Sequence, residues 1–156
     1  MKYYNTIASS YNDLYGTEQL EKARAILKYI RPSGLLLDIG AGSGISTKLF
    51  EKYCECIALD PSKGLLEQYN GEKVVATAEK IPFPDNHFDV IISITSLHHT
   101  NIKKALKEIF RVAKKDAQIA ITILKKSKVD LSLFKNFKKI DMRKDCLFIN
   151  KILYSK

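Results

Sequence analysis

The strongest constraint on the fold is a short apolar run that meets three closely spaced glycines. Residues 35–39 read Leu-Leu-Leu-Asp-Ile, and Gly40, Gly42 and Gly44 follow at alternate positions. A nearly continuous apolar run is typical of a strand buried on both faces of a parallel sheet. Beyond Gly44 the apolar residues return at helical spacing. The pattern predicts a strand, a tight turn and a helix start, as in a Rossmann-like α/β domain.

The glycine spacing and two carboxylates restrict the ligand that such a turn can hold. A dinucleotide site has the pattern G-x-G-x-x-G, but Ile45 stands here in place of the third glycine of that pattern. Asp38 would repel a pyrophosphate, whereas it suits a ligand that carries an amino group and a sulfonium. Asp60 follows Gly40 by twenty residues, where an acidic residue can hold ribose hydroxyls. Pro61 cannot continue the ladder, so Asp60 is expected at the carboxyl edge of the sheet.

Two further motifs carry a resemblance to a known family. Residues 76–83 read Ala-Thr-Ala-Glu-Lys-Ile-Pro-Phe, close to G-D-A-E-x-L-P-F, and residues 88–99 follow the pattern F-D-x-V…L-H-H. Together with the glycine turn, they resemble the class I S-adenosylmethionine (SAM)-dependent methyltransferases, in particular the ubiquinone/menaquinone methyltransferase-like branch. The family usually has aspartate where this chain has Thr77, which predicts a hold on the adenine weaker by about 1 kcal/mol.

The resemblance implies SAM as the cofactor and assigns positions that would bind it. The turn after the first strand would hold the methionine moiety, the end of the second strand the ribose, and the segment after the third strand the adenine. The expected cofactor-binding residues are Tyr11, Asp38, Gly40, Gly42, Asp60, Pro61, Thr77, Ala78, Glu79 and Ser93.

The remaining periodicity predicts a single domain over residues 1–156, with a seven-stranded, mostly parallel sheet and helices on both faces. Strands are expected at 35–39, 55–59, 73–77, 88–94 and 117–124, and a C-terminal antiparallel hairpin at about 137–143 and 146–153. Helices are expected from the N-caps Thr17, Ser62 and Asn101.

The first sixteen residues are rich in tyrosine and show little periodicity. Tyr4, Ala8 and Tyr11 match a Y-x-x-x-A-x-x-Y segment that, in the resembled branch, folds over the cofactor. Residues 1–16 are therefore expected to form an arm or lid over the site. The alternative is an N-terminal arm that is ordered by packing alone.

Composition predicts a cytoplasmic protein that needs neither disulfides nor metal. The 156 residues can bury one sizeable core, and no apolar run approaches the ~20 residues that span a bilayer. The N-terminus lacks the apolar stretch of a signal peptide. The three cysteines are an odd number, and Cys54 with Cys56 offers too few ligands for zinc.

Basic residues concentrate in the last third of the chain. Residues 101–156 hold 16 Lys and Arg against 5 Asp and Glu, whereas residues 1–100 hold 10 against 12. This asymmetry favours an anionic partner such as RNA. A lysine-rich composition of the kind found in thermophile proteins explains it equally well.

The predicted chemistry needs alignment of the acceptor with the methyl group more than it needs a strong base. His98 is the expected catalytic residue, because a histidine after the fourth strand can take a proton from the acceptor. The alternative is that His98 and His99 serve packing and solvation.

The acceptor carries no motif of its own. No [DNS]-P-P-[YF] loop follows the fourth strand, and no helical cap interrupts the C-terminal third. We expect an open cleft for a macromolecule, RNA or protein, or a site completed by a partner subunit or a second copy. The alternatives are a non-catalytic SAM-binding subunit, a methyltransferase of small molecules and a nicotinamide oxidoreductase.

Overall fold

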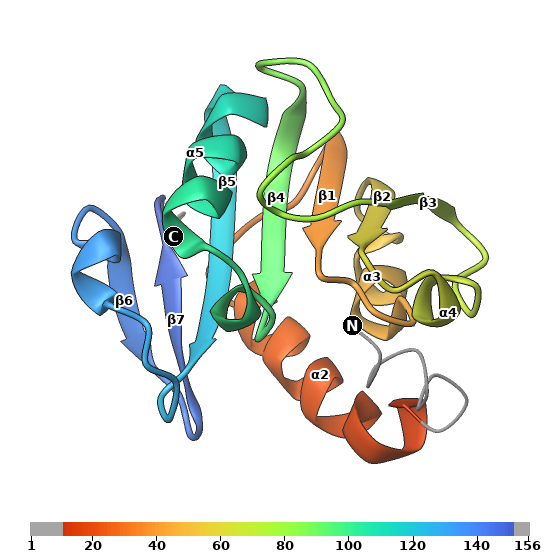
Figure 1. The fold of residues 1–156 in the computed structure, drawn as a ribbon, viewed down its shortest axis with the longest axis horizontal. Helices are drawn as coiled ribbons and strands as arrows, with labels where there is room; N and C mark the ends of the chain where they lie inside the picture. Colours follow the sequence, from red (N-terminus) through yellow and green to blue (C-terminus); the bar gives the residue numbers. More distant parts are fainter. Residues whose placement is uncertain (1–10, 152–156) are drawn as a thin grey trace.

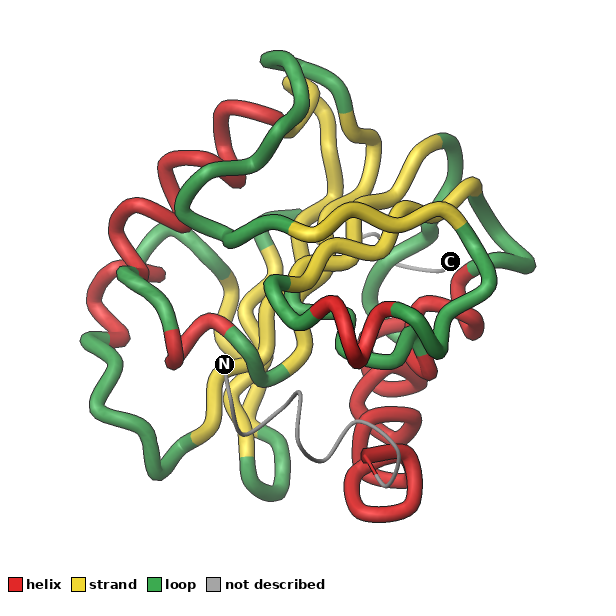
Figure 2. Tube along the Cα trace, turned by 45° about the vertical axis from the view of Figure 1, so that its right-hand side comes forward, coloured by secondary structure: helices red, strands yellow, loops and turns green. Residues whose placement is uncertain are grey.

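The computed structural model describes the backbone of residues 11–151 and the side chains of residues 16–151. Within them, one sheet has the strand order β3-β2-β1-β4-β5-β7-β6, and helices lie on both sides of it (Figures 1 and 2). The strands are β1 (Leu35–Ile39), β2 (Glu55–Asp60), β3 (Glu72–Val75), β4 (Phe88–Ile94), β5 (Ala113–Leu124), β6 (Lys138–Asp141) and β7 (Asp145–Ile149). The helices are α2 (Tyr11–Leu27), α3 (Ile45–Phe50), α4 (Lys63–Leu66) and α5 (Ile102–Val112), with 3₁₀ turns η1 (Leu97–His99) and η2 (Leu131–Phe134). None of these helices is both long and apolar enough to cross a bilayer.

The strand order places a topological switch point between β1 and β4. The chain runs outward from β1 through β2 to β3, and then crosses back to pair β4 with the other side of β1, all in parallel. β5 is parallel to β4, whereas β7 runs antiparallel to both β5 and β6. The predicted mostly parallel sheet with its C-terminal hairpin is thus confirmed. Ligands of open α/β sheets bind outside the carboxyl ends of the strands at such a point.

Successive side chains of β1 point to opposite faces of the sheet and pack in two separate layers of the core. Leu36 packs in one layer with Ile26 of α2 and Phe50 of α3. Leu37 faces the opposite layer, which includes Ile109 of α5. All of these side chains are buried, and each contributes roughly 1.5–3 kcal/mol through removal from water. The central strands are therefore fixed from both sides, which makes their carboxyl ends a rigid edge.

The helix before β1 is longer than the sequence predicts. α2 already includes Tyr11, so Thr17 lies inside the helix, and its prediction as the N-cap was wrong. The apolar spacing that predicts a helix starts only at Leu20, so the sequence pattern does not mark the turns of α2 that precede it. The end of the tyrosine-rich segment is thus helical, while residues 1–10 and the Tyr11 side chain lie outside the described residues.

Two other helix starts follow the sequence closely. Ser62 Oγ accepts a hydrogen bond from Leu65 N at 3.3 Å, and Asn101 Oδ1 accepts one from Lys104 N at 3.2 Å. Both residues are therefore the predicted N-caps.

Arg111 fastens the loop between β3 and β4 to helix α5. Its guanidinium donates to the carbonyl oxygens of Ile81 and Phe83, both at 2.8 Å, and pairs with the carboxylates of Glu108 and Asp85. Glu108 in turn accepts from Ile81 N at 2.8 Å. Arg111 therefore holds the loop that leads from the predicted adenine side to β4.

Replacing Arg111 with lysine should destabilise the fold, because a single ammonium cannot reach two carbonyls and two carboxylates in the fork geometry of arginine. We expect the free energy of unfolding, measured by urea denaturation, to fall by about 1–2 kcal/mol. The matched control is Arg24→Lys on the exposed face of α2, which should change it by less than about 0.5 kcal/mol. Equal effects of the two substitutions would contradict this role.

Candidate functional site

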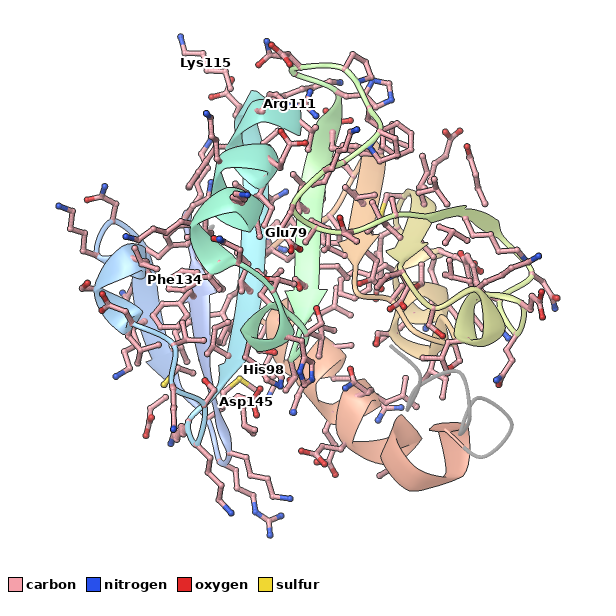
Figure 3. All side chains as sticks on the ribbon, in the orientation of Figure 1. Glu79, His98, Arg111, Lys115, Phe134 and Asp145 are labelled. Atoms are coloured by element: carbon pink, nitrogen blue, oxygen red, sulfur yellow. The ribbon has the colours of Figure 1, made fainter. Side chains whose placement is uncertain are left out.

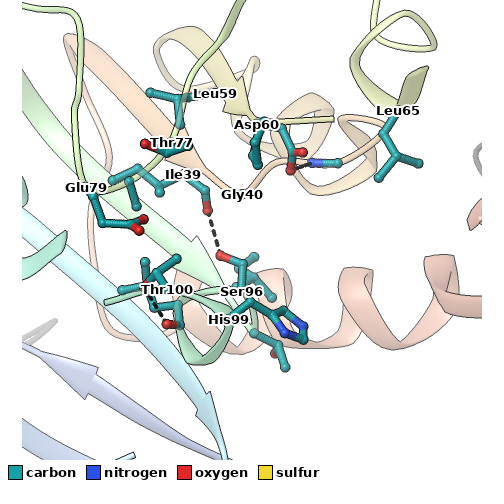
Figure 4. A pocket seen from close by; sticks show the side chains of 16 residues that line it. Ile39, Gly40, Leu59, Asp60, Leu65, Thr77, Glu79, Ser96, His99 and Thr100 are labelled. Atoms are coloured by element: carbon teal, nitrogen blue, oxygen red, sulfur yellow. Dashed lines mark hydrogen bonds between the residues drawn. The ribbon is translucent and has the colours of Figure 1, made fainter. Parts of the chain in front are cut away.

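A cavity of about 250 Å³ opens at the carboxyl edge of β1, β2 and β4 (Figure 4). Its lining residues come from four segments, within residues 39–42, 59–65, 77–79 and 94–100. These are the turn after β1, the end of β2, the loop after β3 and the turn after β4. Segments far apart in the sequence therefore meet at the switch point.

Asp60 connects the cavity to the glycine turn. Its Oδ2 accepts a hydrogen bond from Gly42 N at 2.9 Å, and its Oδ1 accepts one from Ser62 N at 2.8 Å. Burial raises the pKa of the Asp60 carboxyl, and the two amides oppose that shift. Each carboxylate oxygen keeps a further lone pair, and Asp60 lines the cavity (Figure 4). Asp60 can therefore also accept hydrogen bonds from a pair of ligand hydroxyls.

Gly40 lets two turns approach each other closely. Its φ is 72°, and a Cβ at this position would lie 2.1 Å from Ser96 Oγ. A side chain would thus be both strained and in collision with the turn after β4. Glycine here brings the ends of β1 and β4 together.

The amides of the glycine turn are used within the protein. Gly40 N and Ala41 N both donate to Leu59 O, at 2.7 and 3.0 Å, and Gly42 N donates to Asp60. These amides could otherwise donate to a ligand carboxylate, but in the structure all three donate hydrogen bonds to residues of β2. Gly40 and Gly42 therefore contribute close approach of the main chain rather than free donors.

Asp38 stands behind the cavity rather than in its wall. The carboxyl is 1% exposed, does not line the cavity, and its Oδ2 accepts a hydrogen bond from Thr47 Oγ1 at 2.7 Å. Burial raises the pKa of Asp38 to about 7; the bond from Thr47 opposes this, and the charge of Asp60 adds to it. Asp38 is therefore placed to act on the site through its charge and through α3.

Hydroxyl groups tie the turn after β4 to β1. Ser93 Oγ donates to Ile39 O at 3.0 Å, and Ser96 Oγ donates to the same carbonyl at 3.1 Å. The two hydroxyls also lie 2.8 Å apart. Ser96 lines the cavity (Figure 4), whereas Ser93 is fully buried below it. The hydrogen bond of Ser93 attaches the end of β4 to the end of β1.

The two histidines of η1 face different surroundings. His99 lines the cavity. His98 does not, and its Nδ1 is buried without a hydrogen-bond partner. Burial lowers the pKa of His98, and the charge of His99 lowers it further, against the opposing effect of Asp145. The structure thus favours a neutral His98 imidazole, which can accept a proton.

Seven of the ten predicted cofactor positions line one cavity. They are Gly40, Gly42, Asp60, Pro61, Thr77, Ala78 and Glu79. Asp38 and Ser93 lie behind it, and Tyr11 has no described side chain. Apart from its histidines, the segment from Thr95 to Thr100 is not predicted from the sequence as part of the cavity wall. Its position after a central strand at the switch point is the signal that could have identified it.

No group of three His, Cys, Asp or Glu side chains among residues 16–151 could hold a metal ion. Cys54 Sγ and Cys56 Sγ lie 3.9 Å apart at the start of β2, and Cys56 packs in the core.

The strand order and the position of the cavity define the class of protein: a Rossmann-like α/β domain with a cavity at the switch point of its sheet. The family described as methyltransferase domain matches residues 37–121, which is more than half of the chain. The chain belongs to this methyltransferase family, and its class I members use SAM as the cofactor.

Several proteins are similar to this chain. The ubiquinone/menaquinone biosynthesis C-methyltransferase of Burkholderia mallei is 36% identical over 138 residues, covering 76% of this chain and 57% of that protein. A SAM-dependent methyltransferase from Aquifex aeolicus has a TM-score of 0.74 at 23% identity, covering 91% of this chain and 96% of that one. A Haloferax volcanii structure, described as a complex of a methyltransferase with its activator Trm112, has a TM-score of 0.71 at 17% identity, covering 77% and 59%. The last two establish the fold. The chain spans about half the length of the curated relatives it matches.

The raised pKa of Asp38 predicts how stability depends on pH. The folded state keeps a proton up to about pH 7, whereas the unfolded chain loses it near pH 4. The contribution of Asp38 to stability therefore falls as pH rises from about 4 to 7. Asp38→Asn should be more stable than the natural chain at pH 8, by roughly 4 kcal/mol, and nearly equal at pH 4.

Urea denaturation at the two pH values measures this difference. Glu67→Gln, at an exposed position, is the matched control and should show no such pH-dependent gain. A gain in Asp38→Asn that is equal at both pH values would refute the assignment.

Proposed function

We propose that this chain transfers a methyl group from SAM to an acceptor that approaches the turn after β4. The observation that carries the proposal is the position of Asp60. This residue lines the cavity at the end of β2, and each of its carboxylate oxygens can accept a further hydrogen bond. An acidic residue at this point suits the two hydroxyls of a ribose. The match of residues 37–121 to the methyltransferase family supports a nucleoside of the SAM type over a dinucleotide.

The other residues of the cavity fit a nucleoside with an amino-acid arm. Leu59, Leu65 and Ala78 supply apolar contacts for a base, and Thr77 and Glu79 supply polar groups beside it. Gly40 and Gly42 would allow the arm to lie close to the main chain, with the charge of Asp38 behind them. When bound, SAM supplies an activated methyl group on a sulfonium.

The catalytic step needs an acceptor held in line with that methyl group. His99 lies in the cavity wall, and His98 has a pKa lowered by burial. We assign His98 as the residue that takes a proton from the acceptor, with His99 as its neighbour on the cavity side. Tyr11 would contact the cofactor from the helix that precedes β1.

Asp60→Asn should weaken SAM binding by at least about tenfold, because the amide has one acceptor oxygen where the carboxylate has two, and no charge. Isothermal titration calorimetry with SAM and S-adenosylhomocysteine measures the loss. Asp116→Asn, on the exposed amino-terminal part of β5, is the control and should bind normally. Tight NADH binding, or no SAM binding by the natural chain, would overturn the proposal.

We propose RNA as the acceptor. Thr77 and His99 are exposed at the rim of the cavity, so an acceptor can reach it without entering the core. Lys103, Lys104 and Lys107 project from α5, which starts just beyond His99. These charges suit phosphates near the cavity. The similar Haloferax methyltransferase is in complex with the activator Trm112, which supports a partner subunit for this chain as well.

Incubation with radiolabelled SAM and separated RNA, protein and small-molecule fractions of an extract tests the acceptor. Label in RNA is the expected result, with an affinity for RNA that falls with salt at a slope near −0.7 per neutralised phosphate. Replacing Lys103, Lys104 and Lys107 with glutamine should reduce that slope by about two to three units. Label in the protein or small-molecule fraction, or SAM binding without any transfer, would exclude the RNA acceptor.

A further inference from the structure

Thr95 adopts a backbone conformation that threonine rarely takes. Its φ is 51°, in the left-handed region, at the first residue after β4. A β-branched side chain disfavours this region, and such a conformation costs about 1–3 kcal/mol and persists only where the surroundings impose it. Thr95 also lines the cavity at the switch point. The strained residue is therefore part of the wall of the proposed cofactor site.

Three side chains impose this conformation. Thr95 N donates to Thr122 Oγ1 at 2.8 Å, and Lys22 Nζ donates to Thr95 Oγ1 at 2.9 Å. Thr95 Oγ1 donates to Asp145 Oδ2 at 2.6 Å and lies 3.1 Å from Thr122 Oγ1. Because the Thr95 hydroxyl gives its one hydrogen to Asp145, the hydrogen between the two threonines comes from Thr122. Every hydrogen-bonding position of the Thr95 hydroxyl is thus used.

Lys22 and Asp145 form a buried ion pair around this hydroxyl. Their Nζ and Oδ1 atoms lie 3.0 Å apart, and their side chains are 8% and 0% exposed. Lys22 Nζ also lies 3.2 Å from Glu18 Oε1. Asp145 lies beside His98, where the end of the β6–β7 hairpin meets α2 (Figure 3). A buried pair of this kind is often no more stabilising than apolar side chains of the same size, so its place beside the cavity points to a function.

The ion pair also lines a second cavity. This cavity has a volume of about 280 Å³ and lies between α2 and the β6–β7 turn. Thr95, which both residues contact, lines the first cavity. Hydrogen bonds of Thr95 to Lys22 and Asp145 therefore connect lining residues of the two cavities.

We propose that Lys22, Asp145 and Thr122 are positioning residues that hold Thr95 in its left-handed conformation and so shape the cofactor cavity on the side of the acceptor. The inference rests on the proposed function. It makes helix α2 and the β6–β7 hairpin energetically coupled to cofactor binding, although none of their described side chains lines the first cavity. The three residues act through Thr95 and do not touch the cofactor.

Matched substitutions at Thr95 provide the first test. Thr95→Ser keeps the hydroxyl and should bind SAM as the natural chain does. Thr95→Val keeps the shape, loses the hydroxyl, and should bind SAM about tenfold more weakly, the effect of one lost hydrogen bond to a charged group. Equal affinities of the serine and valine variants would overturn the proposal.

A double-mutant cycle tests whether Lys22 acts through Thr95. Lys22→Met alone should weaken SAM binding in calorimetry by about the same factor as Thr95→Val, and the double variant should bind no more weakly than either. Thr122→Val gives the same cycle if the lysine variant does not fold. Lys28→Met, at an exposed position of the turn after α2, is the control and should leave the affinity unchanged.

The outcomes separate this inference from the proposed function. Additive losses in the cycle, or lower melting temperatures with unchanged SAM affinity, would assign the network to stability alone and overturn the proposal. If the natural chain does not bind SAM, the proposed function itself fails. If the natural chain binds SAM and Lys22→Met binds equally well, only the positioning role fails.

Discussion

The site depends on one carboxylate that holds two turns of the main chain. Asp60 accepts the amide of Gly42, in the turn after β1, and the amide of Ser62, which caps α4. Both hydrogen bonds are made to a buried carboxylate, and a hydrogen bond to a charged group contributes about 1.5–3 kcal/mol. The same carboxylate lines the cavity. The residue that is proposed to bind the ribose is therefore also the residue that shapes the glycine turn.

Two polar networks meet at the turn after β4. On the cofactor side, the hydroxyls of Ser93 and Ser96 attach the turn to the carbonyl of Ile39. On the other side, Thr95 is held by the buried pair of Lys22 and Asp145. Adjacent residues are thus fixed from opposite directions. A wall held in this way needs no rearrangement when a ligand binds, which is the condition for aligning two reactants.

The sequence predicts those parts of the fold and site that local patterns encode. The apolar run before Gly40 and the spacing to Asp60 predict β1, β2 and the switch-point cavity, because strand burial and glycine turns are properties of neighbouring residues. The start of α2 and the role of Arg111 could not be predicted in this way, since both depend on packing between distant segments. The clearest case is the ion pair of Lys22 and Asp145, which are 123 positions apart.

Asp38 shows how burial changes the meaning of a sequence motif. The sequence predicts that Asp38 suits a ligand with an amino group and a sulfonium, and the structure raises the pKa of this carboxyl to about 7 through burial and the neighbouring charge of Asp60. The negative charge behind the glycine turn therefore increases as pH rises through neutrality. A cationic sulfonium is favoured over its neutral thioether product by that charge, so the preference for the cofactor over its product should be strongest where Asp38 is ionised.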